Sequence, residues 1–180
     1  MRFSRDRRGQ SVVIGTVILF GFLILALSLY QVQVVPQQNG QVEFQHFEEV
    51  RNDLTELRAG ILTAGQADTP QFKSIELGTR YPTRLLAINP PPPAGTIQTS
   101  DAYSVRITNG TTNVTIPSRF ITYQPGYNEL SRAPTRYDNS VLYLDASENG
   151  GGIAVIEGQS LVDNSTVRLT LLQNKFQRGG

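Results

Sequence analysis

The stretch SVVIGTVILFGFLILALSLY, from Ser11 to Tyr30, has no charged residue in its 20 positions and is apolar around the whole circumference of any helix it forms. A helix of this length measures about 30 Å, which is the thickness of the hydrocarbon core of a bilayer. The rest of the chain is too polar to surround such a helix. The stretch therefore predicts a single membrane-spanning or filament-core helix.

The residues on either side of this stretch give it a direction. Five charged residues precede it, namely Arg2, Arg5, Asp6, Arg7 and Arg8. The ten residues that follow, 31–40, carry no charge. Because positive charge stays on the cytoplasmic side, we expect a cytoplasmic amino terminus, contact of the helix with membrane lipid, and an extracellular location for everything beyond residue 31.

Composition excludes several classes of function. The 180 residues include 16 Lys and Arg against 15 Asp and Glu, and residues 36–180 hold 12 basic against 14 acidic residues. A basic face for nucleic acid is therefore not expected outside the leader. The chain has no cysteine, which excludes disulfides, thiolate catalysis and zinc ribbons.

Three kinds of amino terminus fit residues 1–30. A secretory signal peptide would use Ala26-Leu27-Ser28 as its small-residue cleavage site, although the apolar run is long for that class. A plain signal anchor would have the same basic flank and the same apolar helix. The third kind depends on the junction Arg7-Arg8-Gly9-Gln10, which stands directly before the apolar run.

With that junction, RRGQSVVIGTVILFGFLILAL resembles the amino terminus of archaeal type IV pilin-like proteins, particularly haloarchaeal ones. The resemblance implies a basic leader, 1–9, which a prepilin peptidase removes on the cytoplasmic side between Gly9 and Gln10. It also implies a helix over 10–35 that assembles with copies of itself or with other pilin-like subunits. While the leader remains, moving the helix out of the membrane would cost about 2.5–3.5 kcal/mol for each arginine.

The match to this family has two departures. The haloarchaeal pattern has proline where this chain has Val12, and bacterial pilins have glutamate where this chain has Ile14. The second departure weakens the expectation of glutamate-guided assembly more than that of cleavage. Within the helix, Ser11 and Gly15 form a small pair that would permit close helix packing. The membrane helix is marked by four residues, Ser11, Gly15, Gly21 and Tyr30.

An amphipathic neck helix is predicted over 36–66. Pro36 should kink or stop the preceding helix. The apolar residues then recur on one helical face, at Phe44, Phe47, Val50, Leu54, Leu57 and Ile61. We expect this stripe to pack on the following domain or on a neighbouring subunit. The acidic residues Glu49, Asp53 and Glu56 fall on another face and are expected to be solvated.

Residues 67–180 are predicted to form an extracellular β domain, which makes the expected fold class α+β with a small antiparallel β-sandwich-like domain. The Asn109-Gly110 pair predicts a tight hairpin, and Pro90 to Pro93 predict a stiff loop. The expected strands are Phe72–Leu77, Arg84–Ile88, Ala102–Thr108, Asn113–Ile116, Phe120–Tyr123, Val141–Leu144, Ile153–Glu157 and Val167–Leu172.

Two further features agree with a surface location. Glycosylation sequons begin at Asn109, Asn113 and Asn164. The segment from Tyr123 to Glu129, YQPGYNE, is similar to one in uncharacterised haloarchaeal membrane-anchored proteins with the same pilin-like start. Its tyrosines are expected to pack against a sheet with their hydroxyls pointing outward, or to form an aromatic binding face.

The sequence contains no constellation typical of catalysis. His46 is the only histidine and is expected to be structural. Asp145 to Gly150 imitates the first half of a calcium loop, but position 12 is Ile156, so a hairpin turn is the better interpretation. We expect no enzyme activity, cofactor or metal. The two functional hypotheses are a pilin-like structural subunit and an unprocessed, single-pass envelope protein whose β domain binds a ligand.

Overall fold

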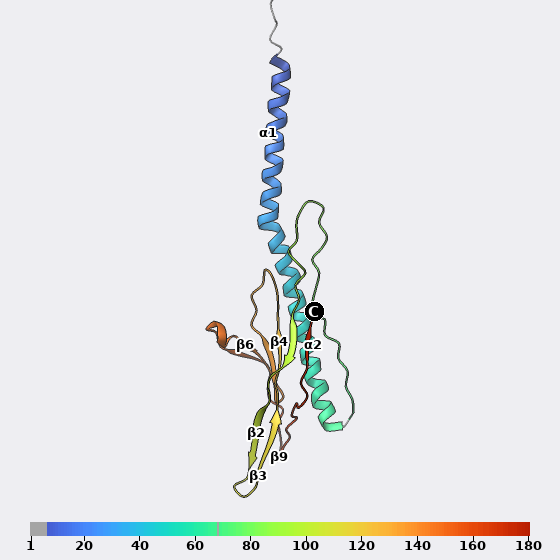
Figure 1. Cartoon of the computed structure of the whole chain (residues 1–180), viewed down its shortest axis with the longest axis vertical. Helices are drawn as coiled ribbons and strands as arrows, with labels where there is room; N and C mark the ends of the chain where they lie inside the picture. The colour runs from blue at the N-terminus through green and yellow to red at the C-terminus, as the bar shows by residue number, and fades with distance from the viewer. Residues whose placement is uncertain (1–6, 68) are drawn as a thin grey trace, which may run out of the picture.

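The computed structural model describes residues 7–67 and 69–180. One long helix begins near the amino terminus, and a β domain is attached to the second half of that helix only (Figure 1). The sheet domain is antiparallel throughout, so the predicted α+β fold class is confirmed. The leader residues 1–6 lie outside the described residues.

The long helix has three parts: α1 (Arg7–Leu29), the π-helical η1 (Tyr30–Val34) and α2 (Val35–Ala67). The helix does not stop at Pro36, so that prediction is wrong, and the predicted kink stays a prediction. The Val35 N–H bonds the carbonyl of Tyr30, five residues earlier. Proline lacks an N–H and its ring crowds the carbonyl four residues before it, so a wider turn directly before Pro36 relieves that conflict.

The main sheet has six strands in the order β10-β1-β4-β5-β6-β7. They are β1 (Thr96–Thr99), β4 (Ile121–Gln124), β5 (Thr135–Asp138), β6 (Val141–Asp145), β7 (Ile153–Glu157) and β10 (Gln177–Gly179). Two hairpins extend from it, formed by β2 (Tyr103–Thr108) with β3 (Asn113–Ser118) and by β8 (Val162–Asp163) with β9 (Thr166–Val167). A short 3₁₀ turn, η2 (Ser147–Asn149), lies between β6 and β7, where the sequence predicts a hairpin turn.

The hydrophobic core lies between α2 and one face of this sheet. Phe47, Val50 and Leu54 from the predicted stripe are buried there, and Leu57 and Ile61 pack at its margin. The sheet contributes Ile97, Ile121, Tyr123, Tyr137 and Leu142. The stripe therefore packs on the chain's own β domain, one of its two expected partners. Because α2 covers this face, the sandwich-like arrangement is not confirmed.

Some strand predictions fail for identifiable reasons. Phe72–Leu77 and Arg84–Ile88 are irregular, because they lie in the long connection that runs back along the helix from α2 to β1. Only the first residue of the predicted Val167–Leu172 is in a strand, although Leu172 makes an isolated bridge with Arg119. Strands β1, β5, β8 and β10 were not predicted.

The β2–β3 hairpin is confirmed, but its turn is longer than predicted. Thr108 pairs with Asn113, so four residues connect the strands. The side-chain oxygen of Asn109 accepts hydrogen bonds from the backbone N–H groups of Thr111 and Thr112, at 3.1 and 2.7 Å. This Asx-type closure replaces the two-residue turn that Asn-Gly favours.

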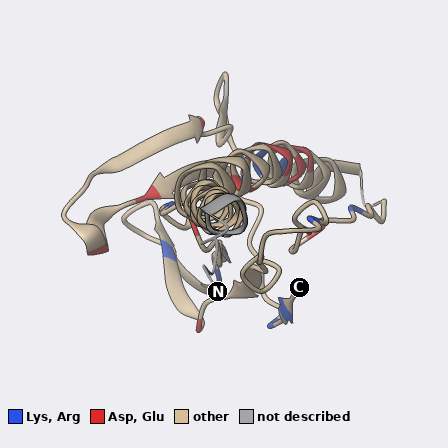
Figure 2. Ribbon diagram, turned by 90° about the horizontal axis from the view of Figure 1, so that it is seen from above, with Lys and Arg blue, Asp and Glu red and all other residues tan. Residues whose placement is uncertain are grey.

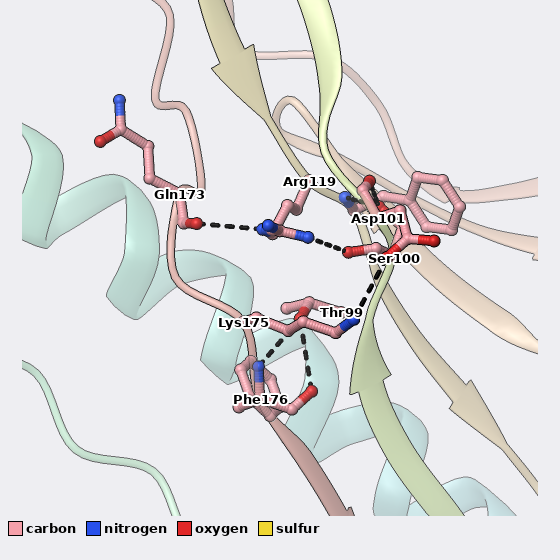
Figure 3. A network of polar contacts seen from close by, with 8 residues as sticks. Thr99, Ser100, Asp101, Arg119, Gln173, Lys175 and Phe176 are labelled. Carbon is pink, nitrogen blue, oxygen red and sulfur yellow. Dashed lines mark hydrogen bonds and ion pairs between the residues drawn. The ribbon is translucent and has the colours of Figure 1, made fainter.

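The carboxyl-terminal segment completes the sheet beside β1 (Figure 3). Thr99 and Phe176 exchange backbone and side-chain hydrogen bonds. The Arg119 guanidinium donates to the carbonyls of Ser100 and Gln173, at 2.6 and 3.0 Å. These bonds compensate for the absence of apolar side chains in β10.

Candidate membrane anchor and its junction with the β domain

The apolar helix is bare in this chain. None of its most hydrophobic 18-residue window is buried, and the mean hydropathy of that window is 2.8. Twelve large apolar side chains of α1 have between 50 and 71% of their surface exposed. They are those of Val12, Val13, Ile14, Val17, Ile18, Leu19, Phe20, Phe22, Leu23, Ile24, Leu25 and Leu29. An apolar surface of this extent is not stable in water. It is consistent with a single-pass membrane anchor.

Two hydroxyl groups of α1 bond within the helix. The Thr16 hydroxyl donates to the carbonyl of Val12 at 2.9 Å, and the Ser28 hydroxyl donates to that of Ile24 at 2.8 Å. Such bonds remove the cost of placing a hydroxyl in hydrocarbon. From Ser11 onward α1 is uncharged, and Figure 2 shows charged residues on α2 and on the β domain.

The small residues of α1 face open space. A Cβ atom added at Gly15 or Gly21 would meet nothing within 4 Å, and Ser11 is exposed. The helix face on which Ser11 and Gly15 lie is therefore available to another helix, but the chain itself supplies none. Tyr30, the last of the four predicted helix markers, begins the π-helical segment and is half-buried.

The predicted cleavage site lies at the start of the helix. Gly9 and Gln10 are the third and fourth residues of α1. The first four N–H groups of a helix have no partner within it, so this turn frays more readily than the interior. The bond between Gly9 and Gln10 therefore lies in the first turn of α1, and its cleavage stays a prediction.

A long loop ties the β domain to the end of the apolar helix. The Gln31 side chain donates to the carbonyl of Ile88 at 2.8 Å and accepts from the Ile88 N–H at 2.9 Å. About two turns further along, Arg84 donates to the side-chain oxygens of Gln38 and Asn39, both at 3.0 Å. The loop is therefore attached to the helix at two levels.

A buried carboxylate that the sequence did not reveal holds a second loop. Glu43 of α2 is fully buried and accepts backbone N–H bonds from Asn128, Glu129 and Leu130, at 2.8, 2.9 and 2.8 Å. It also accepts a hydrogen bond from the hydroxyl of Tyr81. The distinctive YQPGYNE segment therefore ends on the helix. Only the helical spacing of Glu43 from Phe47 could have suggested that it faces the core.

His46 has the structural role that the sequence predicts. It is buried, and its Nε2–H donates to the carbonyl of Glu76 at 3.0 Å, which leaves Nδ1 to accept from the Tyr127 hydroxyl at 2.8 Å. The tyrosines are core residues, as one of the two interpretations expects. Tyr123 is completely buried, so the expectation that its hydroxyl points outward is wrong.

The three sequon asparagines lie on the surface of the β domain. Asn109 is in the β2–β3 turn, Asn113 begins β3, and Asn164 is in the β8–β9 turn with a φ of 51°. All three are exposed. Their use as glycosylation sites stays a prediction. Within residues 7–67 and 69–180, His, Asp and Glu side chains do not gather in threes as metal ligands do.

Comparison with family models, with curated proteins and with solved structures gave no match.

Proposed function

We propose that this chain is a pilin-like structural subunit of the archaeal cell surface, processed by a prepilin peptidase between Gly9 and Gln10. Its amino-terminal helix anchors it in the membrane or assembles it with copies of itself. Its β domain is extracellular and is glycosylated at one or more of the exposed sequons. The proposal draws on the resemblance of residues 7–27 to archaeal pilin-like proteins.

The observation that carries the proposal is the division of the helix into two halves. The α2 half buries Phe47, Val50 and Leu54 against the sheet, whereas no residue of α1 from Ser11 to Leu29 is buried. A helix that served only the domain core would end where the sheet ends. The bare half must therefore be covered by something outside the chain, which is either lipid or the same helix of other subunits.

Removal of the leader lets the α1 half exchange one partner for the other, first lipid and then the same helix of other subunits. The leader arginines hold the helix in the membrane, because each would have to cross the hydrocarbon during extraction. Cleavage removes Arg2, Arg5, Arg7 and Arg8 in one step. The uncharged helix that remains can then leave the bilayer for a filament core.

Intact-mass measurement of the membrane-extracted protein tests the cleavage. The proposal expects a chain that begins at Gln10. A Gly9→Phe variant should keep its leader because a bulky side chain replaces the small residue at the cut, and the exposed Gly152→Ala should be processed normally. A mature protein that begins at Met1 or Arg2 would establish the unprocessed envelope anchor instead. One that begins at Leu29 would establish an ordinary signal peptide.

Assembly is tested separately. Shearing of cells that produce the processed protein should release it in a filament fraction. Processed protein that stays entirely with the membrane would restrict the proposal to a pilin-like anchored protein.

A further inference from the structure

The connection between α2 and β1 bends back on itself near Leu85, and the exposed apolar residues at this bend, Leu85, Leu86 and Ile88, are called the apex. Leu85 is fully exposed, Leu86 is 75% exposed and Ile88 is 81% exposed. Three large aliphatic side chains of one loop therefore bury little of their surface within the chain. Because isolated exposed apolar residues are common but clusters of them are not, this apex requires a partner.

The apex is held at a defined height on the helix. The two hydrogen bonds of the Gln31 side chain fix the backbone of Ile88, and the Arg84 guanidinium fixes the start of the apex beside Asn39. In Figure 1 this loop, drawn in green, rises away from the sheet beside the helix as far as the end of α1. The position of the three apolar residues is therefore set by η1 and α2, not by the β domain alone.

The position of the apex along the helix coincides with the edge of the predicted bilayer. Ser11 to Tyr30 is the uncharged run that matches the hydrocarbon thickness, and Gln31 is the first residue after it. Ile88 lies beside Gln31, so the apex stands next to the helix at the boundary between acyl chains and head groups. An apolar segment at this depth contacts lipid without spanning the membrane.

The charges around the apex suit a lipid surface. Residues 77–95, which precede β1, include two basic residues, Arg80 and Arg84, and no acidic residue. Arginine near an interface is attracted by anionic head groups. An acidic loop at the same place would be repelled.

We propose that Leu85, Leu86 and Ile88 insert into the outer boundary of the bilayer as a second, interfacial membrane contact, an inference that rests on the proposed anchoring through α1. The helix and the loop then make two contacts with the same membrane. Two contacts fix the tilt and rotation of the β domain relative to the surface, which a single helix does not.

Single-cysteine labelling tests this contact in the full chain, since the chain has no cysteine of its own. An environment-sensitive fluorophore is attached to Leu86→Cys, to Leu19→Cys in α1, or to Thr111→Cys in the exposed β2–β3 turn. Each protein is placed as one copy in a nanodisc of phosphatidylcholine and phosphatidylglycerol. Leu86→Cys should show blue-shifted emission, quenching by shallow spin-labelled lipid, and iodide quenching several-fold weaker than at Thr111→Cys.

The outcomes separate the inference from the anchoring on which it rests. If Leu86→Cys is as accessible to iodide as Thr111→Cys while Leu19→Cys is protected by lipid, the anchor stands and the inference is overturned. If Leu19→Cys is itself accessible, the anchoring fails. Protection of Leu86→Cys that requires two copies in one nanodisc identifies a second subunit as the partner and overturns the lipid contact.

A matched pair of glutamine variants tests the attachment of the loop. Gln31→Ala removes both bonds to Ile88, and Gln33→Ala changes an exposed glutamine two residues away. Added to Leu86→Cys, Gln31→Ala should increase iodide quenching and Gln33→Ala should not. Equal quenching in the two variants would show that Gln31 does not hold the apex at the membrane.

Discussion

The carboxylate of Glu43 accepts a hydrogen bond from the hydroxyl of Tyr81, and both residues are buried between the helix and the loops that cover it. This pair joins α2 to the connection between α2 and β1. Tyr81 lies 38 residues after Glu43 in the chain. The same carboxylate receives three backbone N–H groups from the segment after Tyr127. One side chain therefore fixes two loops to the helix.

Glu43→Gln should lower the free energy of unfolding by about 3 kcal/mol. The amide that replaces one carboxylate oxygen donates hydrogen bonds itself, so it leaves buried N–H donors without an acceptor. Chemical denaturation in detergent micelles measures the change. Glu49→Gln on the exposed side of α2 is the control and should change the value by less than about 0.5 kcal/mol. Equal stability of the two variants would contradict the role of Glu43.

Gly126→Ala should destabilise the chain by several kcal/mol, on the order of the largest single-residue effects. A Cβ at this position would lie well inside the contact distance of the Ala94 carbonyl oxygen, which is backbone and cannot rotate away. The same two residues are also joined by a hydrogen bond from the Ala94 N–H to the Gly126 carbonyl, at 3.3 Å. Thermal unfolding checks the prediction.

The matched control is Gly152→Ala, whose Cβ would meet nothing within 4 Å. It should leave the unfolding temperature unchanged. A Gly126→Ala variant that unfolds at the same temperature would show that the two loops can separate at little cost.

The helical half of the fold follows from sequence periodicity. Phe47, Val50 and Leu54 recur at spacings that only a helix brings to one face, and they are buried. Glu43 falls on that face too, but a charged residue in a helical pattern is usually solvated. Its burial depends on N–H groups 85 to 87 residues away, and no local pattern contains that information.

The unpredicted strands have too little apolar signal. β1 is Thr96–Thr99 with one buried aliphatic residue, Ile97, and β10 is Gln177–Gly179 with none. Their place in the sheet is fixed by pairing with neighbours and by the bonds of Arg119, which are long-range. Conversely, the apolar run that was expected as a strand at Arg84–Ile88 remains exposed, because its position is set by Gln31 and Asn39.

A chain that begins at Gln31 should be soluble, and its β domain should unfold at the same temperature as that of the full chain in micelles. The reason is that α1 makes no buried contact with the sheet, whereas α2 supplies the helical side of the core. Thermal unfolding followed by circular dichroism measures both. A truncated chain that aggregates, or that unfolds at a much lower temperature, would show that α1 contributes to the folded domain.

Alkaline pH should destabilise the full chain in micelles through its buried tyrosines. Burial, and then the hydrogen bond to Glu43, raises the pKa of Tyr81 from 10.0 to about 12. Burial also raises the pKa of Tyr123, Tyr127 and Tyr137. In the unfolded chain these phenols ionise near pH 10, so their contribution to stability is complete below that pH.

Between about pH 10 and 12 the unfolded state loses the Tyr81 proton while the folded state keeps it, so stability falls by up to about 1.4 kcal/mol per pH unit for this group. Denaturation at a series of pH values measures the slope. Tyr81→Phe lowers stability at every pH because Glu43 loses a donor, but it should also make the slope above pH 10 shallower than in the parent chain. An unchanged slope would mean that Tyr81 ionises at the same pH in the folded and unfolded states.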